Sequence, residues 1–254
     1  MKQLYFAIPV MMNVLVSFAV MFPCIALAAG PWEIFETSFE SSKKYENPFL
    51  DVQVDALFEK AETRWKIPAF WDGGNVWKVR FAPPKQGTYT YRVISTDPSN
   101  KSLNGIQKTL RVTAYKGNNK LYQHGMIGIS EDQRHFSHAD GTPFFWLADT
   151  WWKCLAKRLD WEGFQELAAD RKEKGFTVIQ IVAGPYPDEG PLEPMWENEG
   201  GMPYHTKDFK VINPDYWKYA DRRLQHLIDA ELVPTIVGAW GRPGRLRCDE
   251  ACRS

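Results

Sequence analysis

The stretch that decides the fold is Phe144-Phe145-Trp146-Leu147-Ala148-Asp149-Thr150-Trp151-Trp152. Its first five residues form a continuous apolar run, which is typical of a strand that is covered on both faces. Polar and aromatic residues follow directly, at the point where such a strand would end. The stretch therefore predicts a buried strand over residues 144–148 whose carboxyl end carries Asp149, Trp151 and Trp152.

Helices and strands alternate in the sequence that follows. Asp160 is a suitable N-cap for a helix that stops at Gly175, and the apolar run at 176–182 predicts the next strand. Asn213-Pro214 is a cap followed by proline at the first helical position, and residues 232–240 predict a third strand. The order β-α-β-α-β requires parallel strands with right-handed crossovers. Both a doubly wound sheet and a (β/α)8 TIM barrel begin in this way. Because no glycine-rich nucleotide loop follows any strand, the barrel is favoured.

Upstream, residues 30–115 alternate apolar and polar side chains with a period of two. Segments such as 77–81 and 89–93 are separated by turn signals such as Asp72-Gly73-Gly74-Asn75, a pattern that predicts an all-β sandwich. The spacing of Trp77, Val79 and Phe81, followed by Gly87, Tyr89 and Tyr91, resembles the immunoglobulin-like domain ahead of many bacterial glycoside hydrolase barrels. We interpret this domain as a structural spacer, with glycan binding as the alternative.

The first residues have the features of an export signal. Lys2 gives a positive start, residues 4–22 are mostly apolar, and Ala26-Leu27-Ala28 provides a small-x-small cleavage pattern. A signal peptide over residues 1–28 predicts a secreted or periplasmic protein of a bacterium, with no stable membrane anchor after cleavage. The alternative is an uncleaved anchor, since the apolar run is long enough to span a bilayer.

Short motifs along the α/β part also resemble a known family. The stretch 145–152 is similar to the first barrel strand of the apiosidase-like glycoside hydrolases, which are relatives of the cellulase-type clan. Residues 213–217 with Asp221-Arg222-Arg223 match their second helix, and residues 232–234 with 238–241 match their third strand. The resemblance implies a barrel over residues 120–241, of which about three strands are present. It also implies a sugar substrate.

Aromatic residues stand where the predicted strands end. In a barrel the carboxyl ends of the strands carry the site, so we expect a sugar-binding cleft there, lined by Asp149, Trp151, Trp152, Tyr186 and Trp240. For Asp149 the alternative is a structural role in bonding nearby backbone. The acidic segment 186–205 is either a solvated loop or a wall of the cleft.

Glycoside hydrolysis generally needs two carboxyl groups. The resemblance places them after the fourth strand and near the end of the seventh, so we expect the catalytic residues beyond residue 254. Residues 242–254 form an atypical tail with four Arg and no Lys. We interpret the chain as a C-terminally truncated barrel, and Cys248 and Cys252 as accidental. The alternative is a half-barrel that pairs with a second chain.

The balanced charge of the chain argues against nucleic acid as a partner. Lys+Arg and Asp+Glu both number 31, so no net field recruits nucleic acid. No residue spacing predicts a metal site or a cofactor. The export signal and the resemblance together imply an exported glycoside hydrolase, or a fragment of one, acting on plant or microbial polysaccharide or oligosaccharide. The alternative is a non-catalytic carbohydrate-binding or scaffold protein.

The export signal is open to a direct test. We expect signal peptidase to cut after Ala28, because the small residues at 26 and 28 directly follow the apolar run. N-terminal sequencing of protein from the periplasmic or secreted fraction measures the cut. An intact Met1 in that fraction would contradict the prediction.

Overall fold

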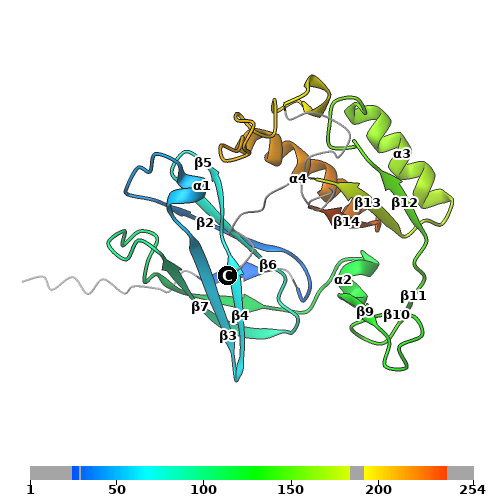
Figure 1. Cartoon of the computed structure of the whole chain (residues 1–254). Coiled ribbons are helices and arrows are strands. Elements are labelled where there is room, and N and C mark those ends of the chain that lie inside the picture. Colours follow the sequence, from blue (N-terminus) through cyan, green and yellow to red (C-terminus); the bar gives the residue numbers. More distant parts are fainter. Residues whose placement is uncertain (1–24, 29, 184–191, 239–254) are drawn as a thin grey trace, which may run out of the picture.

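The computed structural model describes residues 25–28, 30–183 and 192–238. Figure 1 shows two bodies side by side: a β-sandwich built by the first part of the chain, and an α/β unit built by the second. Helix α2 (Lys120–His124) and a small sheet lie where the chain passes from one body to the other.

The sandwich consists of two sheets. One has the strand order β1-β8-β7-β3-β4 and the other the order β2-β6-β5. The first comprises β1 (Ile25–Ala28), β3 (Val54–Lys60), β4 (Thr63–Pro68), β7 (Gly87–Ser95) and β8 (Gln107–Val112). Because β1 is an edge strand that lies within the predicted signal peptide, cleavage after Ala28 would remove it and leave β8 at the edge. The second comprises β2 (Phe35–Glu40), β5 (Phe70–Gly73) and β6 (Val76–Phe81). A short helix, α1 (Pro48–Asp51), joins the two sheets. The predicted β-rich first part is therefore confirmed, and its immunoglobulin-like character stays a prediction.

Alternation along the strands produces one aromatic core between the two sheets. The Phe58 side chain of β3 is fully buried, and its ring stacks on Phe81 of β6 at 4.3 Å and on Tyr91 of β7 at 4.7 Å. Such contacts add to the free energy gained by removing large apolar surfaces from water. Successive side chains of β6 and β7 point alternately into this core and toward solvent, as the period-two pattern predicts.

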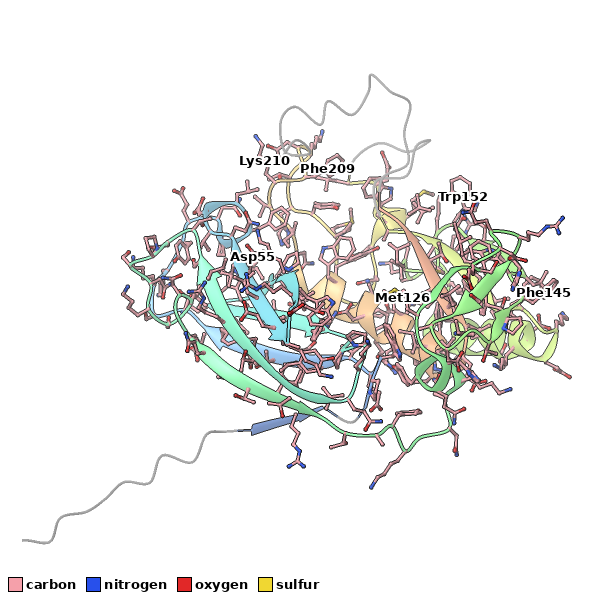
Figure 2. The ribbon with its side chains drawn as sticks, turned by 90° about the horizontal axis from the view of Figure 1, so that it is seen from below. Asp55, Met126, Phe145, Trp152, Phe209 and Lys210 are labelled. Carbon is pink, nitrogen blue, oxygen red and sulfur yellow. The ribbon has the colours of Figure 1, made fainter. Side chains whose placement is uncertain are left out.

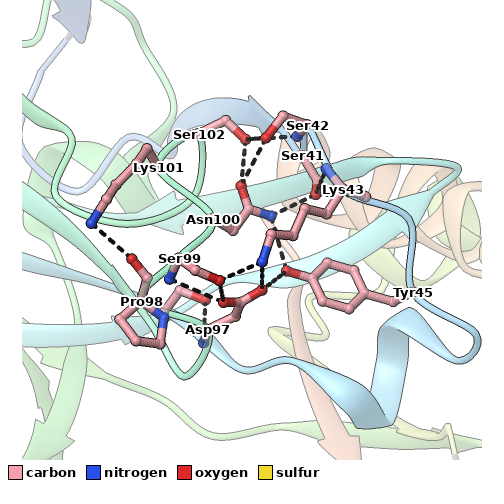
Figure 3. Close-up of polar contacts among 11 residues, drawn as sticks. Ser41, Ser42, Lys43, Tyr45, Asp97, Pro98, Ser99, Asn100, Lys101 and Ser102 are labelled. Carbon is pink, nitrogen blue, oxygen red and sulfur yellow. Dashed lines mark hydrogen bonds and ion pairs between the residues drawn. The ribbon is translucent and has the colours of Figure 1, made fainter.

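A polar network closes one end of the sandwich (Figure 3). The buried amide of Asn100 donates to Ser41 Oγ at 2.7 Å and to Tyr45 Oη at 2.9 Å, and its oxygen accepts from Ser102 Oγ at 2.7 Å. These bonds join the segment after β2 to the loop between β7 and β8. Since each polar atom of the amide has a partner, burial of Asn100 is compatible with stability.

The α/β unit begins with a small antiparallel sheet and continues with a parallel one. Strands β9 (Ile127–Ile129), β10 (Phe136–His138) and β11 (Pro143–Phe144) form the first. The parallel sheet has the order β12-β13-β14, made of β12 (Ala148–Trp151), β13 (Val178–Val182) and β14 (Val233–Val237). Helices α3 (Trp161–Glu173) and α4 (Pro214–Asp229) are the crossovers. This is the predicted β-α-β-α-β order, and the described residues include three strands of it.

The helix boundaries follow the predicted caps. Asp160 Oδ1 accepts from the Gly163 amide at 2.8 Å, and Asn213 Oδ1 accepts from the Asp215 amide at 3.1 Å. Each bond satisfies one of the free N–H groups at a helix start. Gly175 follows α3 with a φ of +80°, a conformation that glycine adopts without strain.

The predicted strand over residues 144–148 is wrong in its placement. Phe144 ends β11, whereas the parallel strand begins at Ala148. The side chains of Phe145 and Trp146 between them are 74% and 41% exposed. The apolar run predicts a strand covered on both faces, but within the described residues β12 has one neighbour, β13, and the run precedes that pairing.

Two polar contacts join the sandwich to the α/β unit. Arg80 Nη2 of β6 pairs with Asp221 Oδ2 of α4 at 2.6 Å, and Arg80 Nε pairs with Glu36 of its own sheet at 2.7 Å. The Asn47 amide donates to the Lys210 carbonyl at 3.0 Å. The Arg80 pKa is raised because hydrogen bonds to the two carboxylates outweigh burial. The two bodies therefore share a fixed interface.

We expect residues 30–115 to fold without the α/β unit, because their core lies within the sandwich. This shorter chain should show a β-type circular dichroism spectrum and a cooperative urea transition. Phe58→Ala should lower its free energy of unfolding by about 3–5 kcal/mol, since it leaves a cavity between the sheets. Absence of a cooperative transition in the unsubstituted chain would show that the sandwich depends on the α/β unit.

Candidate functional site

The carboxyl ends of the three parallel strands lie at one edge of their sheet. β12 ends at Trp151, β13 at Val182 and β14 at Val237, and the Ala183 amide donates to the Val237 carbonyl at 3.0 Å. Trp152 follows β12 at this edge, with its side chain 40% exposed. This edge is where a parallel α/β fold places ligands.

A cavity of about 410 Å³ adjoins Trp152. Its walls combine apolar side chains with two cations and comprise Trp151, Trp152, Lys153, Cys154, Arg158, Leu159 and Leu167. An exposed indole beside lysine and arginine side chains offers a flat apolar surface together with hydrogen-bond donors. The arrangement can bind a polyhydroxylated ligand.

Trp151 faces the helices. It is 6% exposed and packs edge-to-face on Phe164 of α3 at 5.5 Å. Ile179 and Ile181 of β13 share this core with residues of α3 and α4, so both helices cover the same face of the sheet. The structure thus places Trp151 in the core, while Trp152 is the exposed member of the pair.

Asp149 lies on the same face as Trp151 and binds three donors. Its carboxylate accepts from Arg171 Nε at 2.6 Å, from Trp151 Nε1 at 2.9 Å and from the Thr150 amide at 2.8 Å. Burial raises the Asp149 pKa, but the hydrogen bonds from Arg171 and Trp151 outweigh it, so the pKa lies below its ordinary value. Asp149 is therefore an ionised group that fixes the Trp151 ring. Its predicted contact with sugar stays a prediction.

The opposite, helix-free face of the sheet carries a polar row that the sequence analysis did not single out. Strand pairing aligns Thr150 with Gln180, and Gln180 with Thr235. Gln180 is the polar residue of the otherwise apolar β13, and its partial exposure leaves its amide accessible. A lone polar residue in an apolar strand was the available signal. In a barrel this face would line the interior.

The segment 192–213 is held firmly against the sheet edge. Trp196 is 1% exposed, contacts Val182 in a common cluster and stacks on Phe209 at 6.3 Å. The buried Asn198 amide donates to the Leu155 carbonyl at 3.2 Å and to the Tyr216 carbonyl at 3.0 Å. In Figure 2, Phe209 and Lys210 of this segment lie at the top of the view, above Asp55 of the sandwich. The segment is therefore packed and hydrogen-bonded in place beside the carboxyl edge of the parallel sheet.

A buried arginine supports the same region. Arg223 of α4 is fully buried and donates through Nη1 to the Cys154 carbonyl, while Nη2 lies 3.6 Å from Glu199. Its Nε has no hydrogen-bond partner among the described residues. Burial raises the pKa of the Cys154 thiol to about 12, so this cysteine is protonated and unreactive at neutral pH.

Two predicted site residues, Tyr186 and Trp240, lie outside the described residues. Within residues 25–28, 30–183 and 192–238, no three His, Cys, Asp or Glu side chains converge as a metal site would require. None of the helices in these ranges is both long and apolar enough to cross a bilayer.

The contact of Asp149 with Arg171 predicts a pH dependence. A carboxyl group whose pKa is lowered on folding stabilises the fold above its unfolded pKa, and the contribution is lost as the pH falls through the folded pKa. Asp149→Asn should lower the free energy of unfolding at neutral pH by about 0.5–1.5 kcal/mol, since partial exposure screens the pair.

The measurement is urea unfolding followed by tryptophan fluorescence at neutral and acidic pH. The difference between Asp149→Asn and the unsubstituted protein should shrink on acidification. Glu162→Gln, on the exposed start of α3, is the control for removal of a carboxylate. A difference that stays constant across the pH range would contradict the assigned role of the pair.

One known structure shares this fold. The chain is similar to a Bacteroides vulgatus protein classed provisionally as a glycoside hydrolase, with a TM-score of 0.63 and 24% sequence identity. The match covers 82% of this chain and 40% of that protein, so the chain spans about two fifths of its length. A family 5 glycoside hydrolase from Bacteroides vulgatus is more distant, with a TM-score of 0.34 and 20% identity over 46% of this chain and 25% of its own length.

Two family models match the chain, one within the sandwich and one within the α/β unit. No curated protein matches the sequence. Residues 28–96, which build most of the sandwich, match a domain of unknown function, DUF5060. Residues 130–250, which include the parallel sheet and its two helices, match the apiosidase-like catalytic domain. The resemblance found in the motifs around Trp151 and Asn213 is thereby confirmed, and the α/β part of this chain is similar to the catalytic domain of the apiosidase-like glycoside hydrolases.

Proposed function

We propose that this chain takes part in glycoside hydrolysis of plant or microbial polysaccharide outside the bacterial cytoplasm, and that it binds glycan along the carboxyl edge of β12–β14. The family match over residues 130–250 supports the class of reaction. The exposed Trp152 at that edge supports the position of the glycan.

Trp152 carries the proposal because its large aromatic side chain is 40% exposed at the carboxyl edge. Trp151, its neighbour, is buried, whereas Trp152 projects beside the cavity of about 410 Å³. Large aromatic side chains left accessible next to a concave surface are typical of binding sites. A pyranose ring has an apolar face of C–H groups that an indole can cover, and its hydroxyls can accept from Lys153 and Arg158.

We further propose that the three parallel strands are the opening of a (β/α)8 barrel. Both crossover helices cover one face of the sheet, as every crossover helix does in a barrel. One half of a doubly wound sheet has the same arrangement, so the barrel is favoured by the match of residues 130–250 to the apiosidase-like catalytic domain. The polar row of Thr150, Gln180 and Thr235 would then face the barrel interior.

The carboxylates near the edge favour a binding role for these residues over a catalytic one. Asp149 pairs with Arg171, Glu197 with Lys157, and Glu199 lies near Arg223. A general acid must hold a proton near neutral pH, and the hydrogen bonds from Arg171 and Trp151, which outweigh burial, lower the pKa of Asp149 and keep this carboxyl ionised. We therefore propose that the catalytic pair is contributed by strands other than these three, and that this chain alone binds glycan without cleaving it.

A hydrolysis assay separates binding from turnover. The 254-residue chain, incubated with arabinogalactan, pectin or xylan, should co-sediment with or be retarded by one of them and release no reducing ends. Release of reducing ends that is abolished by Asp149→Asn or Glu193→Gln would place the chemistry within this chain and contradict the proposal.

Trp152 and Trp146 form a matched pair for testing the position of the site. Their side chains are 40% and 41% exposed, but Trp146 precedes β12 and Trp152 follows it. Trp152→Ala should weaken retardation by soluble polysaccharide in affinity electrophoresis by roughly 2- to 12-fold, because a lost aromatic contact costs about 0.5–1.5 kcal/mol. Trp146→Ala should bind as the unsubstituted chain does. Equal losses in both variants would refute a site at the carboxyl edge.

A further inference from the structure

A second and separate cavity lies between the sandwich and the α/β unit. Its volume is about 620 Å³, within the range of roughly 300–1,000 Å³ that small-molecule sites occupy. Side chains of α1, β5 and β6 form one wall, and the first turns of α4 with Tyr204 and Ile212 form the other. It shares no lining residue with the cavity beside Trp152. Clefts between domains are a common position for ligands.

Aromatic side chains line both walls of this cavity. Trp71 comes from β5 of the sandwich and Trp217 from α4, and Phe49 stands at 45% exposure on α1. Trp71 Nε1 donates to the Gly74 carbonyl at 2.9 Å, which fixes its ring. The Trp217 ring is held edge-to-face by Tyr216 at 5.1 Å and by Tyr204 at 6.1 Å. The two indoles are therefore oriented before any ligand arrives, which lowers the entropy cost of binding.

The charged groups of the lining balance one another. They are two carboxylates, Asp72 and Asp221, and two cations, Arg80 and Lys218. Asp72 pairs with Lys78 at 3.1 Å, Asp221 with Arg80 at 2.6 Å, and Lys218 with Asp215 at 3.0 Å. The ion pairs hold these groups in place, and the net charge of the four lining groups is zero.

This lining discriminates among classes of ligand. An anion would meet the two carboxylates and a cation the two basic groups, so either would be disfavoured by like-charge contacts. A purely apolar ligand would remove water from the charged groups without replacing its hydrogen bonds, which is costly. An uncharged molecule with many hydroxyls can satisfy both the donors and the acceptors, and it can place its C–H faces against the indoles.

We infer that the cavity between Trp71 and Trp217 is a second carbohydrate-binding site that takes a neutral oligosaccharide. The site uses the sandwich as one of its walls, so the sandwich is a part of the binding apparatus in addition to being a spacer. Arg80 and Asp221 close the site from the two bodies, and the Arg80 guanidinium is supported by the Phe70 ring, 4.7 Å from its centroid. The inference goes beyond the proposed function, because binding here needs neither Trp152 nor catalysis.

The test uses the 254-residue chain with xylohexaose, galactohexaose and maltohexaose as neutral probes, and hexagalacturonic acid as the anionic one. Titration calorimetry gives affinities, and hydroxyl-radical footprinting shows which tryptophans a probe protects. We expect at least one neutral hexasaccharide to protect Trp71 and Trp217, and to bind more tightly than hexagalacturonic acid does. Trp71→Ala and Trp217→Ala should each weaken its binding by about 2- to 12-fold.

Surface variants guard against loss of folding. Phe49→Ala changes an exposed ring at the cavity wall and should weaken binding without lowering the urea midpoint, whereas Phe145→Ala, 74% exposed on the α/β unit, should leave binding unchanged. In the Trp152→Ala background, protection of Trp71 and Trp217 should persist, which separates this site from the carboxyl edge. The inference is overturned if no neutral hexasaccharide protects these two tryptophans, if hexagalacturonic acid binds more tightly, or if Trp152→Ala removes the protection.

Discussion

Strand β13 pairs with β12 on one side and with β14 on the other, and the side chains of the candidate site take their directions from this pairing. Because successive residues of a strand point to opposite faces, the register that sets Asp149 beside Ile179 and Trp151 beside Ile181 turns all four toward α3 and α4. The same register turns Gln180 to the free face. A shift by one residue would exchange the two sets, exposing the isoleucines and burying the polar row.

Buried polar side chains hold the helices and the segment 192–213 in position against the parallel sheet. Asn198 binds backbone on both sides of the segment, and Arg223 reaches the backbone at Cys154 from within α4. Among the described residues the buried Arg223 Nε has no hydrogen-bond partner, and burying such a group costs free energy unless other contacts of the guanidinium offset it. Arg223 connects α4 to the segment after β12 through the Cys154 carbonyl, and to the segment 192–213 through Glu199. These two contacts offset part of the cost of burying its charge.

The sandwich contributes to the arrangement through a small number of directed contacts. Arg80 joins Glu36 of the sandwich to Asp221 of α4, and Asn47 binds the Lys210 backbone. These contacts are polar and partly accessible, as is typical of interfaces between domains of one chain. They leave a cavity between the bodies where a fully apolar interface would close, and this is the physical origin of the second binding site.

Local patterns in the sequence determined the helix boundaries and the β-rich character of the first part. Caps at Asp160 and Asn213, the glycine after α3 and the alternation in the sandwich each act within a few residues, so helix boundaries and the β-rich first part were predictable. Trp152 was likewise identified as a candidate because it follows a strand directly. The resemblance of the α/β part to the apiosidase-like glycoside hydrolases also followed from short motifs in order along the chain.

Only the tertiary structure decided which side chains are accessible. Trp151 and Trp152 are adjacent and chemically identical, yet one is 6% and the other 40% exposed, because α3 covers one face of β12. The apolar run at 144–147 lies outside the parallel sheet, since strand pairing is a long-range contact that composition does not specify. The Asp149 carboxylate meets an arginine 22 residues away in sequence. The cavity between Trp71 and Trp217 exists because two bodies, each folded around its own core, meet at that place.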